Sequence, residues 1–213
     1  MKNIFAALAI VLAAVTLAPG TAEAHHHDNS QSDMAGPPNG TVLIIRHAEK
    51  PSNGTGLAPA GEERAAAYAT YFGHFKIGGT TVRIDELVAT ADSEDSVRPR
   101  LTLTPLSQAL DLPIQQPFAD KDVKGLATWL SSQNSRVILV AWHHGKLPKL
   151  LADLGGDPGQ LLPNGVWPDE VYNWLIELRY DAQGHLMSAD RVVEPADLIG
   201  SKNQGSVSFM QAR

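Results

Sequence analysis

The chain has 213 residues, a net charge of −6 at pH 7 and no cysteine. This length suits one domain with a sizeable core, and the lack of cysteine excludes disulfides, thiol chemistry and cysteine-based metal sites. No long basic run occurs, so we expect no nucleic acid as a partner.

Residues 1–24 have the pattern of a secretory signal peptide. Lys2 supplies the positive end, residues 4–18 form an apolar run, and "AEA" ends at Ala24 as a small-x-small cleavage site. The apolar run is too short for a good membrane span. We expect cleavage after Ala24, no stable membrane insertion afterwards, and a periplasmic or extracellular location.

Residues 25–40, "HHHDNSQSDMAGPPNG", predict a flexible His-rich leader. His25, His26 and His27 could bind a metal ion weakly, which is one alternative. A solvated tail is favoured, because three adjacent histidines fix no coordination geometry. The folded domain is then expected over residues 41–213.

The predicted elements alternate between strands and helices along the chain. The expected strands are residues 42–45, 86–90, 137–142 and 174–180. The expected helices are residues 61–72, 101–110, 120–132 and 145–156. The first and third strands are nearly continuous apolar runs, as in strands covered on both faces. This alternation predicts an α/β fold, a three-layer α/β/α sandwich around a mostly parallel central sheet.

Cationic side chains follow three of the predicted strands. Arg46 and His47 end the first, Arg98 lies in the loop after the second, and His143 and His144 follow the third. In such sheets, sites gather at the carboxyl ends of strands. A solvated strand end would explain an isolated Arg-His pair, and most loop arginines are surface residues. Cationic side chains after three strands of one sheet are harder to explain as unrelated surface residues.

This set of side chains suits a phosphoryl group. Arginine forks match phosphate oxygens, a neutral histidine can attack phosphorus, and surrounding cations stabilise the charge on the transferring group. A helix expected to begin after Gly145 would add backbone N–H donors and a favourable dipole.

The stretch "RHAEK", residues 46–50, resembles the Arg-His-Gly/Ala-Glu signature of the histidine phosphatase superfamily, also called the phosphoglycerate mutase-like fold. The resemblance is to a branch 1-like phosphatase and implies that neutral His47 is the nucleophile. It also implies that Arg46, Arg98 and protonated His144 hold the phosphoryl oxygens, and that Asn53 contacts phosphate.

Three further segments carry this resemblance, which covers most of residues 41–181. "SVRPRLT" is similar to an Arg-Ala-x-Gln-Thr motif and aligns Arg98 and Thr102 with it. "VAWHHGKL" is similar to a Val-Ser-His-Gly-Gly element and aligns His144. "GLAPAGEERA" is similar to the element after the first histidine, although Ala58 replaces the usual capping Ser or Thr.

The proton donor is the part of the pattern that the sequence leaves open. Mutase-like members carry a glutamate some 25 residues after the second arginine, but no glutamate lies between Arg98 and His144. We expect weak general-acid assistance, from Asp120 or His143 if from either. Asp120 is favoured as a helix N-cap instead, and His143 could equally be a spacer.

The segment before the last predicted strand, with Trp167, Asp169 and Glu170, could be a substrate-facing loop, but an ordinary turn is favoured. The sequence thus predicts an exported phosphatase that hydrolyses a phosphomonoester or related substrate, small or envelope-linked, through a phosphohistidine. No cofactor and no metal are expected. The alternatives are a phosphate- or phosphosugar-binding protein of the same fold and a metal carrier that uses the histidine tail.

Overall fold

The computed structural model describes residues 36–134 and 136–200. The predicted signal peptide and the three leader histidines lie outside the described residues. Residues 36–40, assigned above to the leader, pack with the domain: the amide of Gly36 bonds to the carbonyl of Gly184 at 3.2 Å and that of Asn39 to the carbonyl of Asp181 at 2.7 Å. Within the described ranges, no helix has the length and apolarity needed to cross a membrane.

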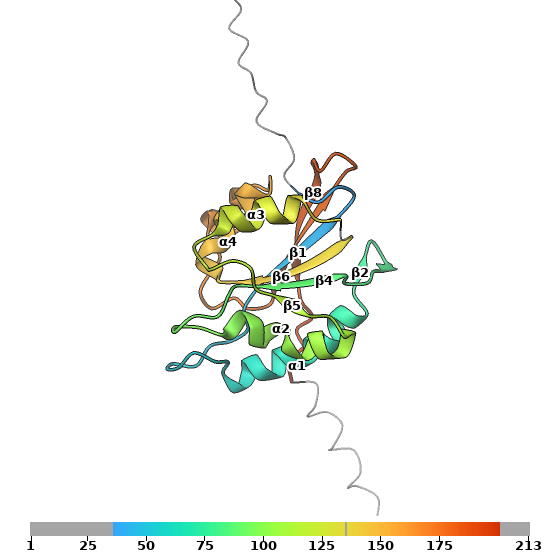
Figure 1. The fold of residues 1–213 in the computed structure, drawn as a ribbon. Coiled ribbons are helices and arrows are strands. Elements are labelled where there is room, and N and C mark those ends of the chain that lie inside the picture. The colour runs from blue at the N-terminus through green and yellow to red at the C-terminus, as the bar shows by residue number, and fades with distance from the viewer. Residues whose placement is uncertain (1–35, 135, 201–213) are drawn as a thin grey trace, which may run out of the picture. The chain divides into compact units, whose positions relative to one another are not determined.

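A six-stranded sheet forms the centre of the fold, in the order β5-β4-β6-β1-β7-β8 (Figure 1). Its strands are β1 (Thr41–Arg46), β4 (Glu86–Ala89), β5 (Ile114–Gln115), β6 (Val137–Trp142), β7 (Trp174–Tyr180) and β8 (Leu186–Val193). The first four pair in parallel, whereas β7 is antiparallel to both β1 and β8. The mostly parallel sheet is confirmed. A small hairpin, β2 (Lys76–Ile77) and β3 (Thr80–Thr81), stands apart from it.

Helices cover both faces of the sheet, so the predicted three-layer α/β/α sandwich is confirmed. The helices are α1 (Pro59–Gly73), α2 (Arg98–Leu110), α3 (Val123–Ser131), α4 (Leu147–Asp153) and α5 (Pro158–Leu161), with 3₁₀ turns η1 (His144–Lys146) and η2 (Pro163–Gly165). In Figure 1, α1 and α2 lie on one side of the sheet and α3 and α4 on the other.

Alternate side chains of β1 pack into two separate hydrophobic cores, one on each face of the sheet. Val42 and Ile44 belong to the cluster built with α3, α4 and α5, while Leu43 and Ile45 belong to the cluster built with α1 and α2. Successive side chains of a strand point to opposite faces, so a strand buried on both faces must be apolar throughout. This is why β1 and β6 have continuous apolar sequences.

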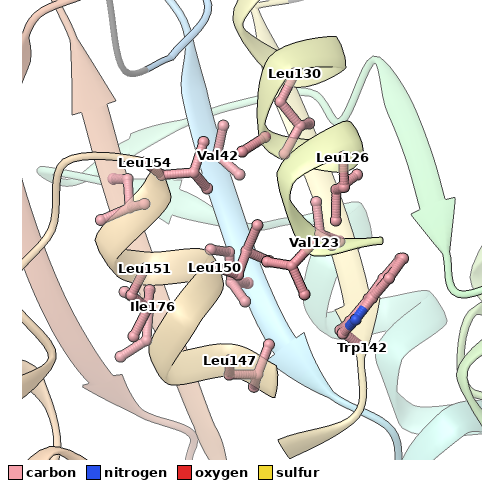
Figure 2. Packing of buried hydrophobic residues seen from close by; sticks show 14 of the residues in the cluster. Val42, Val123, Leu126, Leu130, Trp142, Leu147, Leu150, Leu151, Leu154 and Ile176 are labelled. Atoms are coloured by element: carbon pink, nitrogen blue, oxygen red, sulfur yellow. The ribbon is translucent and has the colours of Figure 1, made fainter. Parts of the chain in front are cut away.

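The core on the α3 and α4 side is dominated by leucine. Figure 2 shows Val42 of β1 among Leu126 and Leu130 of α3, Leu150 of α4 and Leu154, which directly follows α4. These side chains are completely buried, and burial of one such side chain is worth about 1.5–3 kcal/mol. The sheet is therefore a rigid support for whatever its strand ends carry.

Three local predictions need correction. Arg98 is the first residue of α2 rather than a loop residue. The helix after the third predicted strand does not begin at Gly145, because the chain first makes the 3₁₀ turn η1 and α4 starts at Leu147. The N-cap of α3 is Asp122, whose carboxylate accepts from the amide of Gly125, and not Asp120.

Candidate active site

The parallel pairing of β1, β4 and β6 brings their carboxyl ends to one edge of the sheet. β1 ends at Arg46, which pairs with Trp142 at the end of β6. The amide of His47 then bonds to the carbonyl of Trp142 at 3.0 Å. His47 and His143, the residues that follow these two strands, therefore lie side by side. We call Arg46, His47, Arg98, His143 and His144 the strand-end cluster.

His47 is held as a neutral base. Its side chain is almost fully buried, with 2% of the residue exposed, and Nδ1 lies 2.7 Å from the carbonyl oxygen of Ala48. A carbonyl can only accept, so Nδ1 carries the proton and Nε2 keeps its lone pair. Burial, opposed by the Ala48 hydrogen bond and reinforced by neighbouring cations, lowers the pKa of His47 to about 3. At neutral pH the imidazole of His47 is therefore uncharged, with its one proton on Nδ1.

Thr102 joins this loop to the helix that carries Arg98. Its hydroxyl accepts from the amide of Ala48 at 2.8 Å and donates to the carbonyl of Arg98 at 2.8 Å. Thr102 is completely buried. These two hydrogen bonds fix Ala48, the residue after His47, relative to the first turn of α2.

Arg46 is buried beneath the loop of residues 166–173, which we call the β7 approach loop. One terminal nitrogen donates to the carbonyls of Pro168, Asp169 and Val171 at 3.2, 2.5 and 3.2 Å. The guanidinium also lies 3.8 Å from the centre of the Tyr172 ring. Its Nε is buried without a partner among the described residues.

His144 lies between Arg46 and the β7 approach loop. A nitrogen of Arg46 lies 3.3 Å from Nδ1 of His144, and Nε2 lies 2.7 Å from a carboxylate oxygen of Asp169. Since Arg46 can only donate, Nδ1 accepts and Nε2 carries the proton. Burial first, and then the Arg46 charge, lower the pKa of His144, while Asp169 opposes them. With its lone pair on Nδ1 facing Arg46, the imidazole is neutral in this arrangement, whereas the resemblance implies a protonated His144.

Arg98 and Arg100 have different surroundings. Arg98 donates to the carbonyls of Gly54 and Asp95 at 3.0 and 3.3 Å, and its Nε is buried without a partner in the described part of the chain. Its charge contributes to the lowered pKa of His47. Arg100 instead forms an ion pair with Asp92 at 2.7 Å on the surface. Arg98 is the arginine that belongs to the cluster.

Asn53 is the predicted site residue that the structure does not bring into the cluster. It is exposed, and no hydrogen bond of its side chain to the cluster occurs in the described ranges. The neighbouring Gly54 carbonyl accepts from Arg98, so the loop of Asn53 is close while its amide is not engaged.

His143 and Asp120 form the last part of the site. The rings of His47 and His143 lie edge to face, with centroids 5.2 Å apart. One carboxylate oxygen of Asp120 is buried with no partner among the described residues, and the charge of Asp120 acts on His143. Both residues left open as proton donors are therefore at the site.

The structure adds two residues that sequence reasoning missed or set aside, Asp169 and Tyr172. Both lie on the β7 approach loop, for which the sequence pattern favours an ordinary turn. The antiparallel pairing of β7 with β1 brings the start of β7 to the edge where β1 ends. The stretch "PDEVYN" before a strand was the available sequence signal for a functional loop. Only the direction of β7 shows that this loop lies at the edge where β1 ends.

Metal binding finds no support in this site. Within residues 36–134 and 136–200, no three His, Asp or Glu side chains are grouped so that they could hold a metal ion. The predicted independence from metal ions remains a prediction.

No family model and no curated protein matches this chain. Among solved structures, it is similar to SixA of Agrobacterium tumefaciens, described as a candidate phosphohistidine phosphatase, with 18% identity and a TM-score of 0.49 over 74% of this chain and 99% of that one. It is similar to a protein histidine phosphatase SixA complexed with tungstate, with 18% identity and a TM-score of 0.49 over 72% and 96%. It is also similar to a candidate α-ribazole-5′-P phosphatase of Escherichia coli, with 19% identity and a TM-score of 0.48 over 76% and 99%.

Proposed function

We propose that this protein is a metal-independent phosphatase that works through a phosphohistidine on His47. The observation that carries the proposal is a neutral, buried histidine whose Nε2 keeps its lone pair, next to Arg46 and Arg98, each of which has a buried Nε with no hydrogen-bond partner among the described residues. Buried donors are almost always satisfied in folded proteins. An anion bound here would satisfy both.

The electrostatics also favour an anion. Burial is the largest cause that lowers the pKa of both Arg46 and Arg98 from the usual arginine value. The two guanidinium charges are thus only partly compensated by the protein. A phosphoryl dianion would supply the missing negative charge, and arginine forks match its oxygens in geometry.

In the proposed first step, Nε2 of His47 attacks phosphorus and forms an N–P bond. The P–O bond to the leaving group breaks, and its electron pair goes to the departing oxygen. Arg46 and Arg98 stabilise the charge on the phosphoryl oxygens. His144 can donate its Nε2–H to a phosphoryl oxygen when the contact with Asp169 is broken. Single contacts of this kind are worth roughly 10²–10³ in rate.

In the second step, water attacks the phosphohistidine and releases inorganic phosphate. The bond from His47 Nδ1 to the Ala48 carbonyl, at 2.7 Å, keeps the same tautomer through both steps, so Nε2 is again free for the next substrate. The substrate class is a phosphomonoester or a related phosphoryl compound. A pure phosphate-binding protein would have no use for a neutral, correctly oriented nucleophile.

The decisive experiment combines turnover with trapping of the intermediate. Wild-type protein should hydrolyse 4-nitrophenyl phosphate and, when quenched in alkali during turnover of a ³²P-labelled substrate, should carry an acid-labile label at His47. His47→Ala should lose turnover and label together. His74→Ala is the matched control, because His74 is an exposed histidine at the C-terminal end of α1 and should behave as wild type.

Two outcomes would contradict the proposal. Binding of phosphate without turnover would leave the phosphate- or phosphosugar-binding alternative. Loss of activity on chelation, restored by a divalent ion, would show that the reaction depends on a metal.

We also propose that the protein is exported and acts in the periplasm or outside the cell, on a small or envelope-linked phosphorylated substrate. The signal-peptide pattern of residues 1–24 supports this. N-terminal sequencing of the exported protein should begin at His25, and a mature chain that retains Met1 would overturn the proposal.

A further inference from the structure

We propose that His143 is the general acid that protonates the leaving group, and that Asp120 is the residue that positions it. The inference rests on the proposed function and supplies the proton donor that the sequence leaves open. Four observations carry it: the contact of His143 with His47, the orphaned Asp120 oxygen, the anchoring of Asp120, and the arrangement of charges around His143.

The first observation is the contact between the two histidine rings. Their centroids are 5.2 Å apart with an angle of 67° between the ring planes. Both residues follow strands that are hydrogen-bonded to each other, since the His47 amide bonds to the Trp142 carbonyl at 3.0 Å. A phosphoryl group on His47 therefore lies within reach of His143, which is only partly buried.

The second observation concerns Asp120. One of its carboxylate oxygens is buried and has no partner in the described part of the chain. Asp120 does not cap α3, because Asp122 does so. A buried carboxylate oxygen without a structural role is costly, and it is explained if the oxygen receives a proton or a hydrogen bond from an imidazolium during the reaction.

The third observation is that Asp120 is anchored. The indole Nε1 of Trp142 donates to the Asp120 carbonyl at 3.3 Å. Trp142 is completely buried and precedes His143 directly. The same residue thus holds the backbone of Asp120 and directly precedes the histidine.

The fourth observation is the set of charges that face His143. Burial lowers its pKa most; Arg98, His144 and Arg46 lower it further, and Asp120 opposes them. A bound phosphoryl dianion would compensate the two arginines, so substrate binding favours the protonated ring. By contrast, no interaction joins Asp120 to His47 in the described ranges, which argues against Asp120 as the acid itself.

The proton balance of the reaction is then complete. As the P–O bond breaks, the ring of His143 gives its proton to the departing oxygen and becomes neutral. Neutral His143 next accepts a proton from the water that attacks the phosphohistidine. The released phosphate carries the new oxygen, and His143 is protonated again.

The test is a series of phosphate monoesters whose leaving groups span a wide range of pKa, with log rate plotted against leaving-group pKa under conditions where chemistry limits the rate. Wild type should give a shallow slope, in contrast to the weak general-acid assistance expected from the sequence. His143→Gln should give a steep negative slope, with a loss of about 10²–10⁴-fold on alkyl phosphates and a much smaller loss on 4-nitrophenyl phosphate.

Asp120→Asn should give the same pattern with a smaller loss, and it has a second readout. Without the Asp120 charge, the pH above which wild-type activity on alkyl phosphates falls should move to lower pH. A merely structural role of Asp120 would not move this limb. His185→Gln is the matched control, since His185 faces Asp181 at 3.3 Å on the surface and should leave slope and pH profile unchanged.

An unchanged slope in His143→Gln would overturn the proposal. If only Asp120→Asn steepens the slope, Asp120 is the acid and the proposal is again wrong. The parallel His47→Ala assay separates these failures from failure of the proposed function, because His47→Ala abolishes hydrolysis of every ester in the series only if the phosphohistidine route operates.

Discussion

A single buried hydrogen bond decides the chemistry that His47 can perform. The Ala48 carbonyl holds the proton on Nδ1, at 2.7 Å, and thereby turns the lone pair of Nε2 toward the cluster. Thr102 in turn holds the Ala48 amide at 2.8 Å. An imidazole on a solvated strand end would be free to rotate and to take up a proton, so this geometry favours a nucleophile over a surface pair.

At the same scale, Arg98 and Arg100 provide a test of which arginine serves the site. Arg98→Ala should lower kcat/KM by about 10²–10³ because a contact to the transferring group is lost. Arg100→Ala should change it by less than about threefold, since Arg100 only pairs with exposed Asp92 at 2.7 Å. Steady-state kinetics on 4-nitrophenyl phosphate measures both. The reverse result would shift the assignment to Arg100.

Asp169 contacts Nε2 of His144 at 2.7 Å and would compete for it with a phosphoryl group bound as proposed. Asp169→Asn keeps the shape and removes the charge, so inorganic phosphate should inhibit more tightly, by about 1 kcal/mol or about fivefold, as expected when one nearby like charge is removed close to water. The competitive inhibition constant measures this. Asp153→Asn is the control, because Asp153 pairs with Lys149 on α4. Weaker inhibition by phosphate in Asp169→Asn would mean that Asp169 orients His144 instead.

At the scale of elements, the site depends on how the loop after β1 is held against the rest of the fold. The loop after β1 is fastened to α1: Arg64 forms an ion pair with Glu49 at 2.7 Å, and the Ala58 amide bonds to the Glu49 carbonyl at 2.9 Å. Arg64 also pairs with buried Glu194 at 2.7 Å, just after β8. The loop after β1, α1 and the segment after β8 are thus joined through the guanidinium of Arg64.

The close approach of α1 to this loop predicts a specific effect of glycine replacement. A Cβ at Gly61 would overlap the Glu49 carbonyl oxygen and lie 2.9 Å from the Glu49 amide nitrogen. Gly61→Ala should therefore destabilise the fold by about 1–3 kcal/mol and lower kcat by displacing the loop after His47. Urea unfolding and kinetics measure the two effects.

Gly73→Ala is the matched control in the same helix. Among the described residues, no atom outside the neighbouring residues and the helix backbone lies within 4 Å of a Cβ at Gly73, so Gly73→Ala should be neutral or stabilise by up to about 1 kcal/mol. Equal effects of the two substitutions would show that helix propensity, and not the contact with Glu49, is responsible.

At the scale of the whole molecule, burial of neutral His47 should make folding sensitive to acid. Its pKa is lowered to about 3 from an ordinary value of 6.5. Between these values the unfolded chain binds a proton that the folded chain does not, so the free energy of unfolding falls as the pH falls. His143 and His144, whose pKa values are also lowered, act in the same direction.

His47→Gln should flatten this dependence by up to about 1.4 kcal/mol per pH unit between pH 6.5 and 4. The measurement is the free energy of urea unfolding of wild type and variant at several pH values. Glu194 has a raised pKa and acts in the opposite direction, but its contribution cancels in the difference between the two proteins. Parallel curves would mean that His47 is protonated in the folded state.

The sequence by itself determined the layered fold and the residues at the carboxyl ends of β1 and β6. Continuous apolar runs such as Val42–Ile45 indicate a strand that is buried on both faces. Such a run is a local property of the chain and can be recognised in the sequence. Parallel strands in such a fold must end at one edge, so placing His47 near His143 needed no knowledge of the loops. Arg98 was identified as well, although its position as the first residue of α2 was not.

Only the tertiary structure decided what surrounds these residues. The direction of β7 relative to β1 depends on pairing across more than 120 residues, and the stretch "WLIELRY" reads the same for either direction. That direction brings Asp169 to His144 and Tyr172 to Arg46. The anchoring of Ala48 by Thr102 and the burial of an Asp120 oxygen that has no partner among the described residues likewise depend on packing between distant segments, because distances in a packed interior are not encoded by any local pattern.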